Sequence, residues 1–181
     1  MEIRALVARA RNHYVAQFEE FIERQSSGCS RGAAEVKLLL SDKTQLFRHM
    51  YCADFVKNDA GAAIVDLQPE HVLSFDMIAG TFGRAEARIE RLRWDDVIVR
   101  HDLPALREEI FTGWFERWFD PDEKRYEPTL KLSGKIHSLL VETAAVNVDL
   151  GTAPTDAFWQ LLEVLESAGA SDIEVSAGSA K

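Results

Sequence analysis

The segment 110–119 constrains the fold of this chain more than any other part of the sequence. It reads Ile-Phe-Thr-Gly-Trp-Phe-Glu-Arg-Trp-Phe, with apolar residues at i, i+1, i+4, i+5, i+8 and i+9. At roughly 100° per residue, these side chains cover about half the circumference of a helix. Each aromatic side chain buries ~150–250 Å², so this segment offers on the order of 1,000 Å². Because monomers rarely leave a patch that large in water, the predicted helix is either the centre of the core or the surface that meets a partner.

Gly113 lies inside this predicted helix, where glycine costs ~1 kcal/mol relative to alanine. A glycine at such a position indicates close approach of another backbone. Tight internal packing and a bound partner both satisfy that requirement. Trp114 and Trp118 are therefore candidate binding residues, and together with Trp159 they would line an aromatic pocket for a small molecule.

The length and the amino-acid composition of the chain favour one globular domain. The chain has 181 residues, of which 46% are hydrophobic and 28% charged, which is ordinary globular composition. We expect a single α+β domain over 1–176 and a frayed tail over 177–181. Within the domain, a helical N-terminal layer over 1–58 and a sheet-rich part over 61–176 should share one core.

Hydrophobic spacing predicts the elements of the first half. Residues 2–25 have a helical apolar face, and Ser41 is a candidate cap for a second helix that runs through Phe55, after a short strand at 36–40. From residue 62 onward the period becomes alternating, as in half-buried strands. We expect an antiparallel meander over 62–101.

The C-terminal third carries the clearest supersecondary signal. Strands are predicted at 136–142 and 146–150, followed by a helix at 156–168, a helix-terminating Gly169 and a strand at 172–175. The expected fold is thus α+β: a mainly antiparallel sheet with the N-terminal helix and the aromatic helix packed on it, and a C-terminal β-α-β unit.

The charge balance narrows the partner classes. The chain has 21 basic and 30 acidic side chains and a net charge of −9, which disfavours nucleic acid and anionic membranes and suits a protein partner with a basic surface. The longest aliphatic run is 38–40, and the first residues resemble no secretory signal, so we expect a soluble cytoplasmic protein with Cys29 and Cys52 reduced. Whether these two cysteines meet is left open.

Asp95, Asp96 and His101 are the best candidates for catalysis. Neighbouring carboxylates can divide the roles of acid and base, and histidine with carboxylates can hold a divalent metal. Adjacent strand residues point to opposite faces, however, so the two aspartates could act together only in a turn. The competing interpretation is a polar turn followed by a helix cap.

A second acidic group follows the aromatic helix. Asp120, Asp122 and Glu123 start like a calcium loop, but Lys124 occupies the next ligand position and the required glycine is missing. We therefore assign no metal and no cofactor, and interpret these residues as a solvated loop or a contact for a basic partner. The isolated histidines at 13, 71 and 137 are typical of hydrogen-bonded boundary residues.

These observations favour a non-enzymatic protein-interaction domain of the adaptor, inhibitor or immunity kind. The negative net charge and the large number of aromatic side chains support this interpretation. So does the first predicted helix, which has its arginines early and its glutamates late, the reverse of what the helix dipole prefers. One alternative is a small metal-assisted hydrolase or transferase that uses Asp95, Asp96 and His101. Another is a small-molecule-binding domain with an aromatic pocket.

Overall fold

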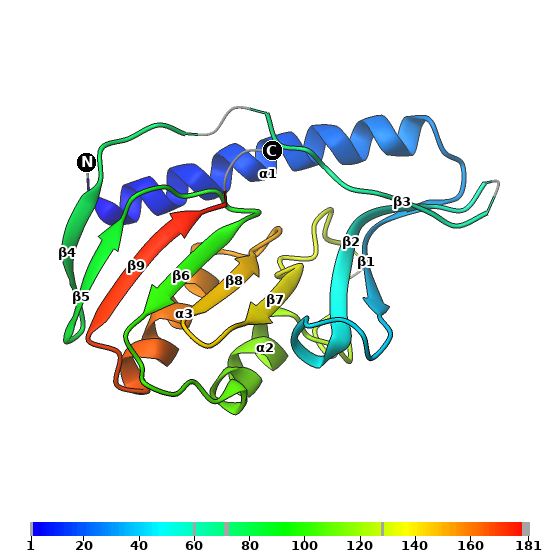
Figure 1. Ribbon diagram of the computed structural model, residues 1–181. Coiled ribbons are helices and arrows are strands. Elements are labelled where there is room, and N and C mark those ends of the chain that lie inside the picture. Colours follow the sequence, from blue (N-terminus) through cyan, green and yellow to red (C-terminus); the bar gives the residue numbers. More distant parts are fainter. Residues whose placement is uncertain (1, 60, 71–72, 128, 179–181) are drawn as a thin grey trace.

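The described part of the chain folds into two β-sheets and three α-helices (Figure 1). A computed structural model describes residues 2–59, 61–70, 73–127 and 129–178. The helices are α1 (Ile3–Ser27), α2 (Thr112–Trp118) and α3 (Thr155–Ser167), with short 3-10 turns η1 (Phe47–His49) and η2 (Glu108–Phe111). The predicted α+β class is confirmed.

The larger sheet has six strands in the order β4-β5-β9-β6-β8-β7. All neighbouring pairs are antiparallel except β5 and β9, which are parallel. The bounds are β4 (Ile78–Phe82), β5 (Ala85–Ile89), β6 (Val97–His101), β7 (Ser138–Val141), β8 (Ala145–Asp149) and β9 (Asp172–Ala177).

The meander expected over 62–101 is wrong. The hairpin of β4 and β5 forms, but β9 from the end of the chain lies between β5 and β6 and pairs with both. Alternation of apolar and polar residues shows that a segment is a strand; it does not show which strand lies beside it. The meander prediction failed because the pairing is non-local.

The smaller sheet is antiparallel and comprises β1 (Gly32–Leu39), β2 (Met50–Lys57) and β3 (Ala63–Val65), with β2 in the centre. The helix predicted from Ser41 is therefore wrong, and the 1–58 layer is α-helical only as far as α1. Residues 52–56 are all buried, and so short a buried and mainly apolar run fits a helix and a central strand equally well by spacing.

The core lies between the sheets and the helices. Figure 1 shows α1 running the length of the molecule, from beside β4 and β5 to the three-stranded sheet. The five aromatic side chains of segment 110–119 are all buried, which assigns most of this helix to the core. They are Phe111, Trp114, Phe115, Trp118 and Phe119.

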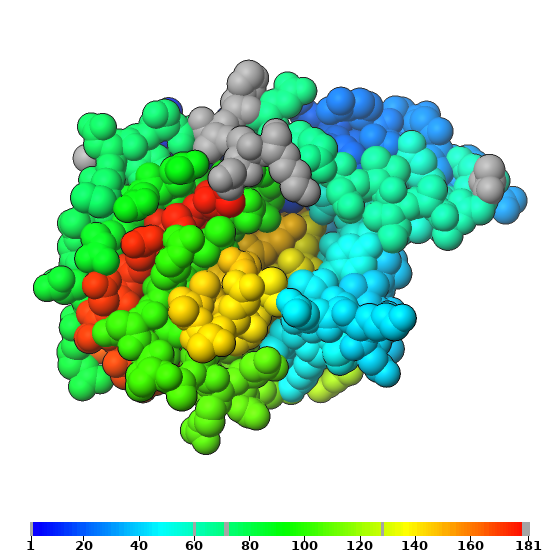
Figure 2. Space-filling model, viewed as in Figure 1, coloured from blue at the N-terminus to red at the C-terminus, as the bar shows by residue number. Residues whose placement is uncertain are grey.

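The C-terminal β-α-β unit forms as predicted. The strands β8 and β9 are both antiparallel to β6, which lies between them, so they are parallel to each other. Gly169 ends α3 with φ +105°, a conformation that glycine adopts without strain. The tail expected at 177–181 overlaps β9 at Ala177, and 179–181 lie outside the described residues. Figure 2 shows strands β9, β6 and β8 at the surface on the sheet face turned to the viewer.

Candidate functional site

The catalytic candidates of the sequence do not come together. Asp95 and Asp96 precede β6, and His101 is its last residue, which places them roughly 15–20 Å apart along the strand. Arg93 pairs with both carboxylates, at 2.6 Å from Asp95 and 3.9 Å from Asp96. His101 accepts a hydrogen bond from the Leu103 amide at 3.3 Å. This strand therefore separates the groups that a shared metal or an acid–base pair would need.

The acidic loop after α2 is held mainly by its own contacts. Asp120 is buried at φ +53°, and its carboxylate accepts hydrogen bonds from the amides of Lys124 and Arg125 at 3.1 and 2.9 Å. Its role is to fix the loop. Asp122 lies 2.9 Å from Lys124, whereas Glu123 lies 3.8 Å from Lys37.

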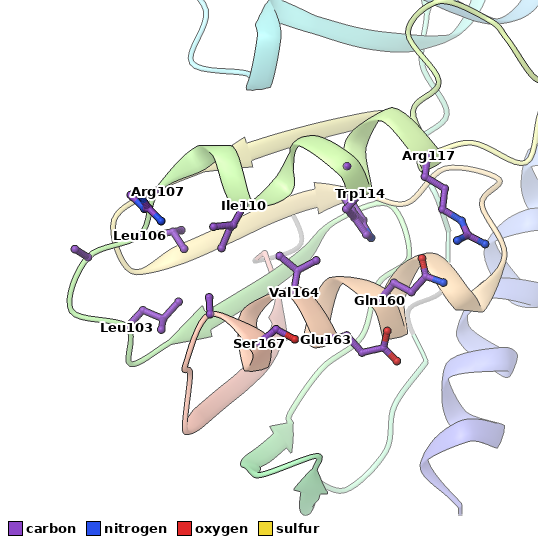
Figure 3. A pocket seen from close by; sticks show the side chains of 13 residues that line it. Leu103, Leu106, Arg107, Ile110, Trp114, Arg117, Gln160, Glu163, Val164 and Ser167 are labelled. Atoms are coloured by element: carbon purple, nitrogen blue, oxygen red, sulfur yellow. The ribbon is translucent and has the colours of Figure 1, made fainter.

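A groove of about 830 Å³ runs between η2 and α2 on one side and α3 on the other (Figure 3). Apolar side chains from both sides meet along it, with Ile110 and Trp114 turned toward Val164. Arg107 and Arg117 stand at opposite ends of the groove. Most of the surface of the aromatic helix therefore packs in the core, and the rest lines the groove.

The three tryptophans proposed for a pocket do not line one pocket together. Trp114 lines the groove and donates its indole hydrogen to the Ala157 carbonyl at 2.9 Å. Trp118 donates to Gln160 at 3.0 Å. Trp159 stacks on Phe82, with ring centroids 6.0 Å apart, outside the residues that line the groove.

Gly113 has open space above it. An added Cβ at this position would meet no atom of the described residues within 4 Å outside the local backbone of its own helix. The close internal approach that its place in a helix suggested is therefore absent from the described residues. Gly113 instead lines the groove, and because it has no side chain, the helix backbone is accessible at this position.

A second candidate site is a buried cluster of charges that the sequence did not predict. His137 is 1% exposed, and its ring contacts two carboxylates: Nδ1 lies 2.9 Å from Asp54, and Nε2 lies 3.2 Å from Glu35. Glu35 also accepts hydrogen bonds from Ser133 and Thr152. The pKa of His137 follows from competing effects. Burial alone would lower it, but the two carboxylates hold it well above its ordinary 6.5.

Local structure explains how these groups meet. Glu35 on β1 and Asp54 on β2 face each other in the strand register, between the pairs Ala34–Phe55 and Val36–Ala53. The main chain of His137 bonds to both sheets, accepting from the Cys52 amide at 2.7 Å and donating to the Asp149 carbonyl at 2.8 Å.

Gly151 makes room for the histidine. It has φ +49°, and a Cβ there would overlap the His137 ring. Any other residue would therefore meet both backbone strain and a collision.

Sequence reasoning missed this cluster because its members come from four distant segments. Two signals were present nonetheless. Asp54 stands within the buried run 52–56, and His137 follows the buried Ile136 next to a strand. Charged residues are rarely buried unless they are paired, so a partner could have been expected for both Asp54 and His137. Both cysteines are free and buried. Burial is the main reason why the pKa of Cys52 is raised to about 12.

Comparisons with protein-family models, curated proteins and solved structures find no match for this chain. Among the described residues, no group of three or more His, Cys, Asp or Glu side chains is placed to hold a metal ion. None of the helices in that part of the chain combines the length and apolar character that crossing a bilayer needs.

Proposed function

We propose that this chain is a non-enzymatic protein-interaction domain, of the adaptor, inhibitor or immunity kind, that holds a segment of a partner protein in the groove between α2 and α3. The observation that carries the proposal is Gly113: a helical glycine facing open space inside a groove lined by apolar and polar side chains. Glycine in a helix costs ~1 kcal/mol relative to alanine, and no packing within the described residues requires it here. A partner backbone lying against this position would require it.

The lining of the groove favours binding over catalysis. It is built from aliphatic side chains, Trp114 and a polar rim that comprises Arg107, Arg117, Gln160, Glu163 and Ser167. Glu163 is the only carboxylate among the described lining residues, which include no histidine or cysteine. Acid–base or nucleophilic catalysis needs at least a pair of such groups within reach of each other. An apolar floor with a polar rim is instead the usual anatomy of a protein interface.

The rim indicates the chemistry of the occupant. Arg107 and Arg117 are exposed and separated by ten positions, which corresponds to roughly 15 Å along helical backbone. We therefore expect a segment with apolar side chains at its centre and a carboxylate toward each end. The net charge of the chain predicts that the partner also has a basic surface. Asp122 and Glu123, in the loop after α2, already pair with Lys124 and Lys37, so that basic surface would contact another part of the chain.

A photo-crosslinking amino acid in place of Gly113 tests the proposal in native lysate. Gly80 is the matched control, since it is also exposed with open space above it but lies on β4. We expect one protein to crosslink at position 113 and not at position 80, through a segment of the predicted chemistry. Gly113→Leu should weaken binding of that purified partner at least about tenfold, or ~1.4 kcal/mol, while Gly80→Leu leaves it unchanged. Equal crosslinking at both positions, or none, would refute the assignment.

A further inference from the structure

A separate cavity of about 220 Å³ lies beside the buried histidine, where α1 crosses the junction of the two sheets. At ~30 Å³ per molecule of liquid water, it has room for a group of several heavy atoms. Acidic and phenolic side chains dominate its wall. The lining residues are Tyr14, Tyr51, Cys52, Asp54, Asp66, Leu67, Asp95 and Asp149.

The wall carries more negative charge than its surroundings neutralise. Asp95 has Arg93 at 2.6 Å, and three carboxylates share His137: Asp54, Glu35 and, at 4.0 Å, Asp149. Within the described part of the chain, no lysine or arginine forms an ion pair with Asp54, Asp66 or Asp149.

Asp66 and Asp149 titrate above their ordinary pKa, first because of burial and then because of this surplus. Asp66 lies at an exposed position, yet partial burial, followed by repulsion from Asp54, raises its pKa. Burial also raises the pKa of Asp149 to about 7, against the opposing charge of His137. The cavity is thus an environment in which an added positive charge is favourable.

The hydroxyl of Tyr14 is the second, independent sign of a ligand. The side chain is 3% exposed and lines the cavity, yet its oxygen has no hydrogen-bond partner among the described residues. A buried hydroxyl without a partner costs ~1–3 kcal/mol. Burial and the negative charges of Asp149, Asp54, Asp95 and Glu35 all raise its pKa, so the phenol stays protonated beside these carboxylates.

We propose that this cavity binds the ammonium or guanidinium group of a small organic cation. The N–H groups of the cation donate to Asp149 and Asp66, and one of them donates to the unpartnered Tyr14 oxygen. The rings of Tyr14 and Tyr51 supply the apolar and π-electron surface on which alkylated cations rest. The site is independent of the α2–α3 groove, because the two share no lining residue.

Isothermal titration of the full chain with n-butylammonium and n-butylguanidinium chloride, at pH 7 and against sodium chloride of equal ionic strength, tests the site. We expect saturable one-to-one binding. Because Asp149 is about half protonated at this pH, binding should release up to about half a proton, read as a buffer-dependent heat. N-acetyl-lysine methylamide distinguishes the source: binding of the free amine alone indicates a small metabolite, and tighter binding of the blocked lysine indicates a side chain of another protein.

Two variants separate binding from stability. Asp149→Asn should weaken butylammonium at least about tenfold. Tyr14→Phe should weaken it about tenfold without lowering Tm, because the lost hydroxyl has no partner among the described residues. Asp172→Asn is the matched control: its carboxylate pairs with Arg88 at 2.8 Å, outside the cavity, and its affinity should equal that of the wild type.

Asp66→Asn provides the same test at an exposed position, should a buried variant fail to fold. Heats no different from those of sodium chloride would overturn the proposal. So would equal affinity in the wild type, Asp149→Asn and Tyr14→Phe, or binding of magnesium or calcium with none of either organic cation. None of these results bears on the groove, so the two proposals fail separately.

Discussion

Replacing Asp149 by asparagine should stabilise the folded protein, and more strongly at alkaline pH than at acid pH. Burial raises the pKa of Asp149 from its ordinary 3.8 to about 7, because leaving water disfavours the charged form. The charge of His137 and the Gly151 amide at 2.8 Å oppose this rise, whereas Asp54 and Asp95 add to it. Asparagine cannot ionise, and it keeps the oxygen that accepts from Gly151.

The sign and size follow from proton linkage. The unfolded chain releases this proton near pH 3.8 and the folded chain near pH 7, so the folded state holds more protons between these values. Stability therefore falls as pH rises through this window and stays lowered above it. At about 1.4 kcal/mol for each tenfold change in proton affinity, the whole window corresponds to ~4 kcal/mol. Water screens a side chain that is 27% exposed, so we expect ~2–3 kcal/mol.

Urea unfolding of both proteins, followed by tryptophan fluorescence from about pH 5 to about pH 9, measures the difference. The stability advantage of Asp149→Asn should already be about 1 kcal/mol at pH 5, because part of the window between 3.8 and about 7 lies below this pH, and it should grow to ~2–3 kcal/mol by the alkaline end. Asp122→Asn is the control: its carboxylate is 67% exposed and pairs with Lys124, so its effect should stay flat. An advantage of Asp149→Asn that does not grow with pH would refute the reasoning.

Other substitutions test the surroundings of the site. Gly151→Ala should cost ~3 kcal/mol or more in urea unfolding, because it adds strain at φ +49° and overlaps the His137 ring; a loss below ~1 kcal/mol would contradict the described geometry. Cys52 should resist iodoacetamide in the native protein and react on unfolding, since its pKa is raised to about 12 by burial; peptide mass spectrometry checks this. Asp120→Asn should cost ~1–2 kcal/mol at neutral pH, and the loss should shrink as pH falls through the lowered pKa of Asp120; a constant loss would remove the charge from the explanation.

The C-terminal unit was predictable because its information is local. Val146 and Val148 alternate with polar residues and are buried, as a strand with one covered face requires. In α3, Phe158, Leu161 and Leu165 recur at helical spacing and are all fully buried, and Gly169 supplies the terminating conformation. Nothing outside this stretch is needed to assign it.

The strand order was not predictable in the same way. Ile173 and Val175 of β9 look equally suited to an edge or to the centre of a sheet by sequence. They are central because β5 and β6 both pair with this strand from segments more than 70 residues away. Local patterns fix which face of a strand is apolar, whereas its neighbours follow from the packing of the whole chain.

The buried cluster depends on the same non-local packing. Glu35, Asp54, His137 and Asp149 have no motif spacing, and the fold alone brings them together. His137 joins the two sheets through its main chain, and its side chain then holds one carboxylate from each of β1 and β2. Losing one partner of a buried charged group typically costs 3–5 kcal/mol. A shift of β1 against β2 by one residue would turn Glu35 to the opposite face and cause that loss. The cluster therefore disfavours other registers of β1 against β2. Because the acidic cavity lies beside the cluster, its position depends on the same register.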